Sequence, residues 1–244
     1  MTGRIIWFAA LAAIAVLTTL LQFDMASKTN ASLAAVVPKP LRNYAQAQVT
    51  LKALGEEDAG HAVDEAQRLV RRRPLPAENL TLLAAAHAKA GAIEPAGQVI
   101  QIAGQRGWRE PVAQEAVLRL ALAAGDEAEA ARRYGALFLR NPTPDSLLEE
   151  LGPAVFGEPG SIGQQTMVAI VIGGERWHAQ FLRRGPRVMP PAAFSSITAE
   201  SLARGAAFDC KLLGQSLNAL AQRDAAAAST LRSVGVGRCP GLGG

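Results

Sequence analysis

The feature that most constrains the fold is a 34-residue repeat in the first two thirds of the chain. Three alanines, Ala62, Ala96 and Ala130, stand 34 residues apart. The same step recurs around them in three sets of residues: Glu57, Gly91 and Gly125; Leu69, Ala103 and Leu137; and Pro74, Trp108 and Pro142. A fixed period of this length predicts stacked helical hairpins rather than one enzyme-like core. Stacks of this kind mostly hold partners and seldom do chemistry.

The composition agrees with an all-α fold. Apolar residues make up 49% of the 244 positions and charged residues 19%, which predicts an ordered chain with a sizeable core. Aromatic residues reach only 5%, whereas alanine is abundant. Small side chains let helices pack closely, and alanine has the highest intrinsic helix propensity.

The net charge of +4 is thinly spread, and its only tight run is Arg71 to Arg73. This run falls at the end of a predicted helix, where cations suit the helix dipole and a solvated surface suits guanidinium groups. A nucleic-acid or lipid patch is the alternative. No aromatic residues are interleaved with the run, as single-strand binding requires, so we expect no nucleic-acid partner.

An apolar segment near the N-terminus predicts a transmembrane anchor over residues 1–23. Residues 5–21 carry no charge, and extension to Phe23 gives about 28 Å of helix against a bilayer core of about 30 Å. Residues 5–23 would then contact the lipid bilayer. A cleavable signal peptide is the alternative, but its apolar region would be shorter, and the following Gln-Phe-Asp-Met is a poor cleavage context.

The topology is inferred from charges and cysteines. Arg4 and the N-terminal amine lie on one side of the segment and Asp24 and Lys28 lie close on the other, which favours a cytoplasmic N-terminus. The two cysteines, Cys210 and Cys239, suggest a disulfide in an exported domain, although two unrelated buried thiols are also conceivable. Closing this loop in the unfolded chain would contribute about 3–4 kcal/mol. These observations place the body outside the cytoplasm.

The remaining chain divides into a linker, three repeats and a C-terminal region. Residues 24–42 mix small and polar side chains and predict a linker. The repeats are 43–76, 77–110 and 111–144, of which the first is degenerate. In the middle repeat an apolar stripe predicts the first helix, Gly91 ends it, and Ala96, Ile100 and Ala103 face inward on the second.

This pattern resembles tetratricopeptide repeats. Ala84, Ala96 and Ala103 match small-residue positions of that family, Gly91 matches its turn, and the terminal proline is matched by Pro74 and Pro142. The departures are Trp108 at the proline position, Leu118 and Leu137 at small-residue positions, and Thr50 in the first repeat. The resemblance covers about 100 of the 244 residues.

The resemblance implies a partner-binding groove lined by the first helix of each repeat. The groove residues that it implies are Tyr44, Ala47, Leu51, Glu78, Thr81, Ala85, Lys89, Glu115, Arg119 and Leu122. Some such repeats hold a C-terminal carboxylate with a clamp that needs Lys, Asn and Arg at set positions. Thr81 and Ala85 occupy two of these positions, so that clamp is absent. A shallow groove of this kind suits an apolar helix or an extended peptide. The alternative occupant is the C-terminal helices of the same chain.

After residue 144 the period is lost, and 145–244 is expected to form a helical domain that caps the stack. The apolar run 166–172 fits a buried strand or a buried helix, and the all-α context favours the helix. Trp177, Phe181 and Leu182 resemble a stretch found in membrane-anchored repeat proteins of alphaproteobacteria.

Residues that could carry chemistry are scattered. His61, His87 and His178 lie in different predicted elements and have no partners at metal-ligand spacing, so we expect no metal. The chain has no nucleophile elbow, no P-loop and no dinucleotide fingerprint. We therefore expect neither an enzyme nor a cofactor.

The sequence thus predicts a single-pass protein of a bacterial inner membrane with a periplasmic all-α body. Its expected role is a scaffold or adaptor that binds protein partners through helical repeats, in envelope biogenesis or secretion. One alternative is an accessory subunit that docks to a specific membrane complex through its transmembrane helix. A second is an exported enzyme or enzyme regulator.

Overall fold

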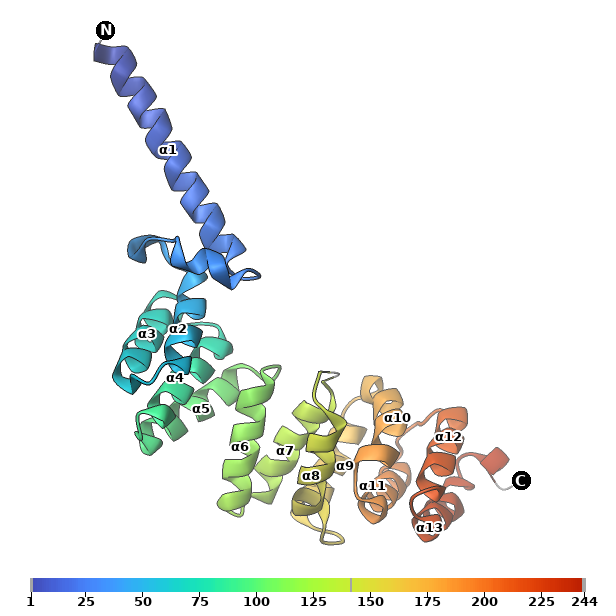
Figure 1. Cartoon of the computed structure of the whole chain (residues 1–244). Coiled ribbons are helices and arrows are strands. Elements are labelled where there is room, and N and C mark those ends of the chain that lie inside the picture. Colours follow the sequence, from blue (N-terminus) through green and yellow to red (C-terminus); the bar gives the residue numbers. More distant parts are fainter. Residues whose placement is uncertain (1, 141, 243–244) are drawn as a thin grey trace. The chain divides into compact units, whose positions relative to one another are not determined.

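The computed structural model describes residues 2–140 and 142–242, and within these ranges every regular element is a helix. This confirms the all-α fold class predicted from the sequence (Figure 1). The chain divides into two compact units, Met1–Ala113 and Gln114–Gly244.

The first unit consists of a long N-terminal helix, two short 3-10 helices and two helical hairpins. Its elements are α1 (Thr2–Ala26), η1 (Ala31–Ala35), η2 (Lys39–Leu41), α2 (Ala45–Gly55), α3 (Ala59–Arg72), α4 (Ala77–Lys89) and α5 (Ile93–Arg106). Within the hairpins α2 packs on α3 and α4 on α5, and α3 also packs on α4. The two hairpins therefore form a continuous stack.

The second unit continues with helical hairpins in two rows. Its elements are α6 (Pro111–Ala123, which starts at the end of the first unit), α7 (Glu127–Phe138), α8 (Asp145–Phe156), α9 (Ile162–Ile172), η3 (Glu175–Trp177), α10 (His178–Val188), α11 (Pro191–Ala203), α12 (Cys210–Ala221), α13 (Ala225–Gly235) and η4 (Pro240–Leu242). One row consists of α7, α9, α11 and α13, each packed on the next. The other row consists of α8, α10 and α12.

The 34-residue step corresponds to the packing of the second helices of the hairpins. Ala62, Ala96 and Ala130 lie near the starts of α3, α5 and α7 and are all buried. Gly91 and Gly125 each form the hairpin turn with a positive φ, 74° and 71°. Only glycine adopts this backbone region without a steric penalty, which explains why the turn repeats together with the alanines.

Helical hairpins continue after residue 144, although the sequence period does not. The core of the second unit is built on large rings: Tyr134, Phe138, Phe156, Phe181 and Phe194 are all buried. The Tyr134 and Phe156 rings meet edge to face with their centroids 4.8 Å apart. A core cluster of the first unit consists of the alanines Ala53, Ala62, Ala66 and Ala86. Large rings replace the small side chains in the second unit, so the alanine pattern that reveals the repeat disappears.

The third predicted repeat, 111–144, lies almost entirely in the second unit. Leu118 and Ala121 of α6 share one hydrophobic core with Tyr134 of α7 and with the aromatic residues of the C-terminal helices. The apolar run 166–172 is helical and belongs to α9, as expected from the all-α context.

Helix α1 is the one helix in the described part of the chain that is long and apolar enough to cross a membrane. Its large apolar side chains are exposed, Ile6 at 68% and Phe8 at 67%. A signal sequence has the same properties, so the uncleaved anchor stays a prediction.

The segment expected to be a linker, 24–42, is instead largely folded against α2. Asp24, in the last turn of α1, is only 4% exposed. Its carboxylate accepts hydrogen bonds from the backbone N–H groups of Asn43 (2.7 Å), Tyr44 (3.1 Å) and Ala45 (2.9 Å). These are the free donors at the start of α2, which has no side-chain cap from its own N-cap residue. The sequence pattern does not reveal this contact, because Asp24 lies about 20 residues before the helix that it caps.

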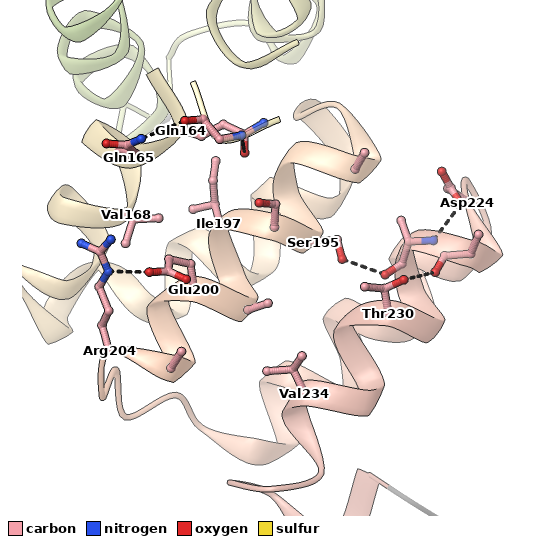
Figure 2. Close-up of a pocket in the computed structure, with 17 residues that line it drawn as sticks. Gln164, Gln165, Val168, Ser195, Ile197, Glu200, Arg204, Asp224, Thr230 and Val234 are labelled. Atoms are coloured by element: carbon pink, nitrogen blue, oxygen red, sulfur yellow. Dashed lines mark hydrogen bonds and ion pairs between the residues drawn. The ribbon is translucent and has the colours of Figure 1, made fainter. Parts of the chain in front are cut away.

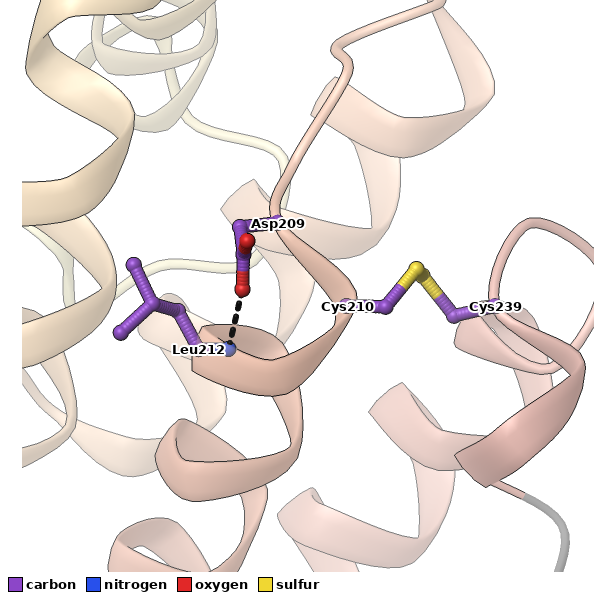
Figure 3. Close-up of a disulfide and its surroundings, with 4 residues drawn as sticks. All are labelled: Asp209, Cys210, Leu212 and Cys239. Carbon is purple, nitrogen blue, oxygen red and sulfur yellow. Dashed lines mark hydrogen bonds between the residues drawn. A yellow bond between two sulfur atoms is a disulfide. The ribbon is translucent and has the colours of Figure 1, made fainter.

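The two cysteines lie at disulfide distance, as predicted, and fasten the last hairpin (Figure 3). Cys210 is the first residue of α12, and Cys239 follows α13, with their Cα atoms 5.6 Å apart. Beside it the carboxylate of Asp209 accepts a hydrogen bond of 2.8 Å from the N–H of Leu212 and so caps α12 (Figure 3).

Candidate partner-binding groove

A groove in the second unit runs across α9, α11 and α13, each of which is the second helix of its hairpin (Figure 2). Its cavity volume is about 920 Å³. The floor is formed by α11, and the walls come from the N-terminal half of α9 and from α13. The groove therefore lies on the row formed by α7, α9, α11 and α13, the second helices of their hairpins.

Small side chains line most of this groove. On α11 they recur at the spacing of one helix face, in Ala192, Ser196, Ala199 and Ala203. On α13 the lining includes Ala226, Ala227 and Thr230. Larger apolar side chains, Val168, Ile197 and Val234, complete it. Because the side chains on the floor are short, a helix of another protein could approach the backbone of α11 closely.

Most of the polar side chains in the groove already have partners within the protein. The hydroxyl of Ser195 donates to the carbonyl of Ala227 at 2.8 Å and ties α11 to α13. Glu200 and Arg204 form an ion pair at 2.7 Å on the rim. Gln164 donates to the carbonyl of Phe156 at 2.8 Å. Figure 2 shows these groups apart from one another rather than converging on one point. The arrangement suits binding, and these groups provide no activated nucleophile.

The groove residues predicted from the sequence lie on the first helices. In the first unit Tyr44 is the N-cap residue of α2, Ala47 and Leu51 lie on α2, and Glu78, Thr81, Ala85 and Lys89 lie on α4. In the second unit Glu115, Arg119 and Leu122 lie on α6. Leu51, Glu78, Ala85 and Arg119 are exposed, as a binding surface requires, whereas Ala47 is half-buried. Whether these first-helix residues bind a partner stays a prediction.

Three of the predicted residues make internal contacts. Thr81 is buried, and its hydroxyl bonds to the Glu110 carboxylate at 3.0 Å. Lys89 donates to the carbonyl of Leu54 at 2.8 Å and also to that of Glu56, so it caps the C-terminal end of α2. The ring of Tyr44 lies beneath the guanidinium of Arg73. A substitution at any of these positions would therefore disturb packing as well as a surface.

The predicted residues on α6 are also engaged. Arg119 bridges Glu115 and Glu150, each at 3.0 Å. Its hydrogen bond to Glu115 and then that to Glu150 raise the pKa of its guanidinium above the ordinary value. Leu122 packs against the core of the second unit. This ion-paired surface joins α6 to α8.

The groove on α9, α11 and α13 was not predicted from the sequence, although the small residues of its floor follow a regular pattern. Ala192, Ser196, Ala199 and Ala203 follow helical spacing inside the stretch PAAFSSITAESLARG. The resemblance to tetratricopeptide repeats ends at residue 144, and it implies a groove on the first helices of the repeats rather than on the second helices.

No metal site is evident in the described residues, which contain no group of three or more His, Cys, Asp or Glu that could hold an ion. His61 is exposed and His87 is half-buried. His178 is buried, with its Nε2 3.0 Å from the carbonyl of Val171 and its ring edge to face against Phe208. Its ring therefore has a packing role.

Comparison of the chain with protein-family models, with curated proteins and with solved structures found no match. The resemblance to tetratricopeptide repeats therefore stays a prediction, and the functional argument depends on this chain's own geometry.

Proposed function

We propose that this protein is a membrane-anchored adaptor that binds a helix of a partner protein. The observation that carries the proposal is the groove of small side chains across α9, α11 and α13. The wider role would be that of a scaffold at the membrane, in envelope biogenesis or secretion. Neither an enzymatic activity nor a cofactor is part of the proposal.

A helix is the occupant that best fits the lining of the groove. An amphipathic helix binds by laying its apolar face into a groove and placing anchor side chains in it. The stripe Ala192, Ser196, Ala199 and Ala203 would allow a close approach of the two backbones. Val168 and Val234, on the two walls, would contact the apolar anchors, and Glu200 and Arg204 would contact polar side chains on the partner's flanks.

The proposed location is a bacterial inner membrane, crossed once by α1, with a cytoplasmic N-terminus and a periplasmic body. The cysteine pair supports this orientation, because disulfides persist in oxidising compartments. The charges around α1 do not support it, because Lys28, Lys39 and Arg42 follow α1 whereas only Arg4 and the amine precede it; the expectation from the sequence weighed only Asp24 and Lys28 on that side. The proposal gives priority to the cysteines.

Protease treatment of spheroplasts tests the orientation. A periplasmic body is digested in intact spheroplasts, whereas a cytoplasmic body is digested only after lysis. The mass of the N-terminal peptide recovered from membranes shows whether residues 1–23 are retained. Complete protection of the body in intact spheroplasts would refute the proposed topology.

Quantitative co-purification from native membranes tests the adaptor function. Ala199→Arg places a long cation on the groove floor, and Ala154→Arg places the same side chain on an exposed position of α8 outside the groove. We expect at least a tenfold loss of the partner with Ala199→Arg and no loss with Ala154→Arg. Equal recovery by both variants would contradict binding in the groove.

An exchange of residues 2–23 for an unrelated membrane helix separates the adaptor from an accessory subunit that docks through α1. Asp24 is kept, because it caps α2. An adaptor retains its partner after the exchange, and a subunit docked through α1 loses it.

A further inference from the structure

Six basic side chains gather where α1 joins the rest of the first unit. They form what we call the basic collar: Lys28, Lys39, Arg42, Arg71, Arg72 and Arg73. Lys28, Lys39, Arg71 and Arg72 are exposed, and the other two are half-buried. Three of the six come from the end of α3, about 45 residues after α1 in the sequence.

Direct contacts hold two of the three α3 arginines, Arg72 and Arg73, at this place. The guanidinium of Arg72 donates to the carbonyl of Arg42. The guanidinium of Arg73 lies over the ring of Tyr44, 4.2 Å from its centroid, and the Lys28 ammonium lies 5.9 Å from the same centroid. The backbone N–H of Tyr44 is in turn bonded to Asp24 in the last turn of α1. The end of α3 is thus fixed to the end of the membrane helix.

The positive charge of the collar is poorly neutralised. Asp24 is the nearby acidic group, and its carboxylate forms hydrogen bonds with three backbone N–H groups rather than an ion pair with a cation of the collar. Glu65, on α3, pairs instead with Arg68 and Gln46. None of the ion pairs found among the described residues includes a collar side chain. The collar therefore presents unpaired cations beside the apolar surface of α1.

We propose that the basic collar binds the phosphate groups of anionic phospholipids in the leaflet that faces the body of the protein. Guanidinium groups match phosphate oxygens in charge and geometry, and basic residues next to a membrane helix attract anionic lipids. The collar adjoins the C-terminal end of α1. If α1 crosses the bilayer, the collar therefore lies next to the lipid headgroups. The proposal rests on the membrane placement of α1, but it does not depend on the partner-binding groove or on which leaflet the body faces. It gives the Arg71–Arg73 run a role as a lipid-facing patch.

Reconstitution of the full-length protein with mixed lipids tests the collar. The protein is inserted into vesicles of equal parts phosphatidylglycerol and phosphatidylcholine, extracted under mild conditions, and the retained lipids are quantified by mass spectrometry. Flotation of the vesicles first shows whether α1 has inserted. Failure to insert refutes the membrane placement itself, whereas insertion without a preference for phosphatidylglycerol refutes only the collar.

Matched variants identify the side chains responsible. The collar variant is Arg71→Gln, Arg72→Gln and Arg73→Gln, and the control removes three exposed arginines near and on α10, Arg176→Gln, Arg183→Gln and Arg187→Gln. Each cation near an anionic surface strengthens binding by about fivefold. We expect the collar variant to lose most of the phosphatidylglycerol preference, by about tenfold or more, and the control to keep it.

A second variant covers a folding defect of the triple variant. Lys28→Gln with Lys39→Gln changes exposed side chains outside the helices of the stack and should lower the preference several-fold. The preference should also fall as salt concentration rises. An equal loss in the α10 control, or an unchanged preference in both collar variants, overturns the proposal.

Discussion

At the scale of single residues, Arg184 does more for the second unit than its position in a charged helix suggests. The residue is 7% exposed. It donates to the carbonyls of Phe138 (2.6 Å), Arg140 (3.0 Å) and Thr143 (2.5 Å) and pairs with Asp145 at 2.7 Å. One guanidinium therefore donates hydrogen bonds to three backbone carbonyls at the end of α7 and in the connection to α8, where carbonyls lack partners within a helix.

Replacement of Arg184 should destabilise the second unit much more than replacement of its neighbour. Arg184→Met leaves buried carbonyls without donors and should cost about 2–3 kcal/mol, whereas Arg183→Met removes an exposed cation and should change stability by less than about 0.5 kcal/mol. Denaturant unfolding of the purified full chain, followed by the fluorescence of Trp177 in this unit, measures both. Equal midpoints for the two variants would contradict the assigned role.

A second close contact concerns Gly185, the next residue on α10. A Cβ at this position would lie 2.5 Å from the ring of Phe194 on α11. The approach of the two helices therefore depends on the absence of a side chain. At Gly97 on α5, by contrast, a Cβ would meet nothing within 4 Å.

Alanine should therefore have opposite effects at the two glycines. Gly185→Ala overpacks a buried contact and should cost about 1–3 kcal/mol. Gly97→Ala should stabilise by about 0.5–1 kcal/mol, because alanine is the better helix former. Thermal unfolding of both full-length variants checks the pair, and a stabilised Gly185→Ala protein would show that the helices can separate without loss.

At the scale of elements, the junction between α1 and α2 is the feature with the clearest mechanical consequence. The cap that Asp24 forms on α2 makes α1 and the first hairpin one connected piece. A flexible linker would have left the first hairpin free to turn relative to α1. The structure instead fixes the first hairpin close to the end of α1.

Removal of this cap should loosen the start of α2. Asp24→Ala leaves three N–H donors without their acceptor, and we expect the first turn of α2 to exchange its amide hydrogens at least about tenfold faster. Asp64→Ala, at an exposed position on α3, serves as the control and should change nothing there. Hydrogen exchange of the reconstituted full chain measures both. Unchanged protection in Asp24→Ala would mean that water replaces the carboxylate without cost.

The elements that could be predicted from sequence are those whose pattern is local. Ala62, Ala96 and Ala130 identified the hairpins, because a small residue is needed where the second helices pack, and Gly91 and Gly125 identified two of the turns, because both adopt a positive φ. The C-terminal hairpins lack this signal, since rings such as Phe181 and Phe194 fill their core. The folded segment after α1 was missed because its stability comes from Asp24, a contact distant in sequence.

The candidate site shows the same limit. The first-helix positions came from a family resemblance, and some of them, such as Thr81 and Lys89, have internal partners that no sequence pattern reveals. The groove on the second helices depends on how α9, α11 and α13 pack side by side. Its small residues could be read from the sequence, but their position together in one cavity could not.

At the scale of the whole molecule, the chain combines a helix able to cross a membrane with two stacks of helical hairpins. The last hairpin is fastened by Cys210 and Cys239, which would protect the end of the chain outside the cytoplasm. In the proposed account the first unit holds the body at the lipid surface, and the second unit presents the groove to a partner.

Site-specific photo-crosslinking in native membranes tests this account most directly. A photoreactive residue is placed at Ser196, on the groove floor, or at Gln215, on the exposed side of α12 outside the groove. The account predicts one adduct of defined mass at Ser196 that disappears when Ala199→Arg is added, and no such adduct at Gln215. An adduct at Ser196 that persists with Ala199→Arg, or the same adduct at Gln215 alone, would contradict binding of a partner helix in the groove.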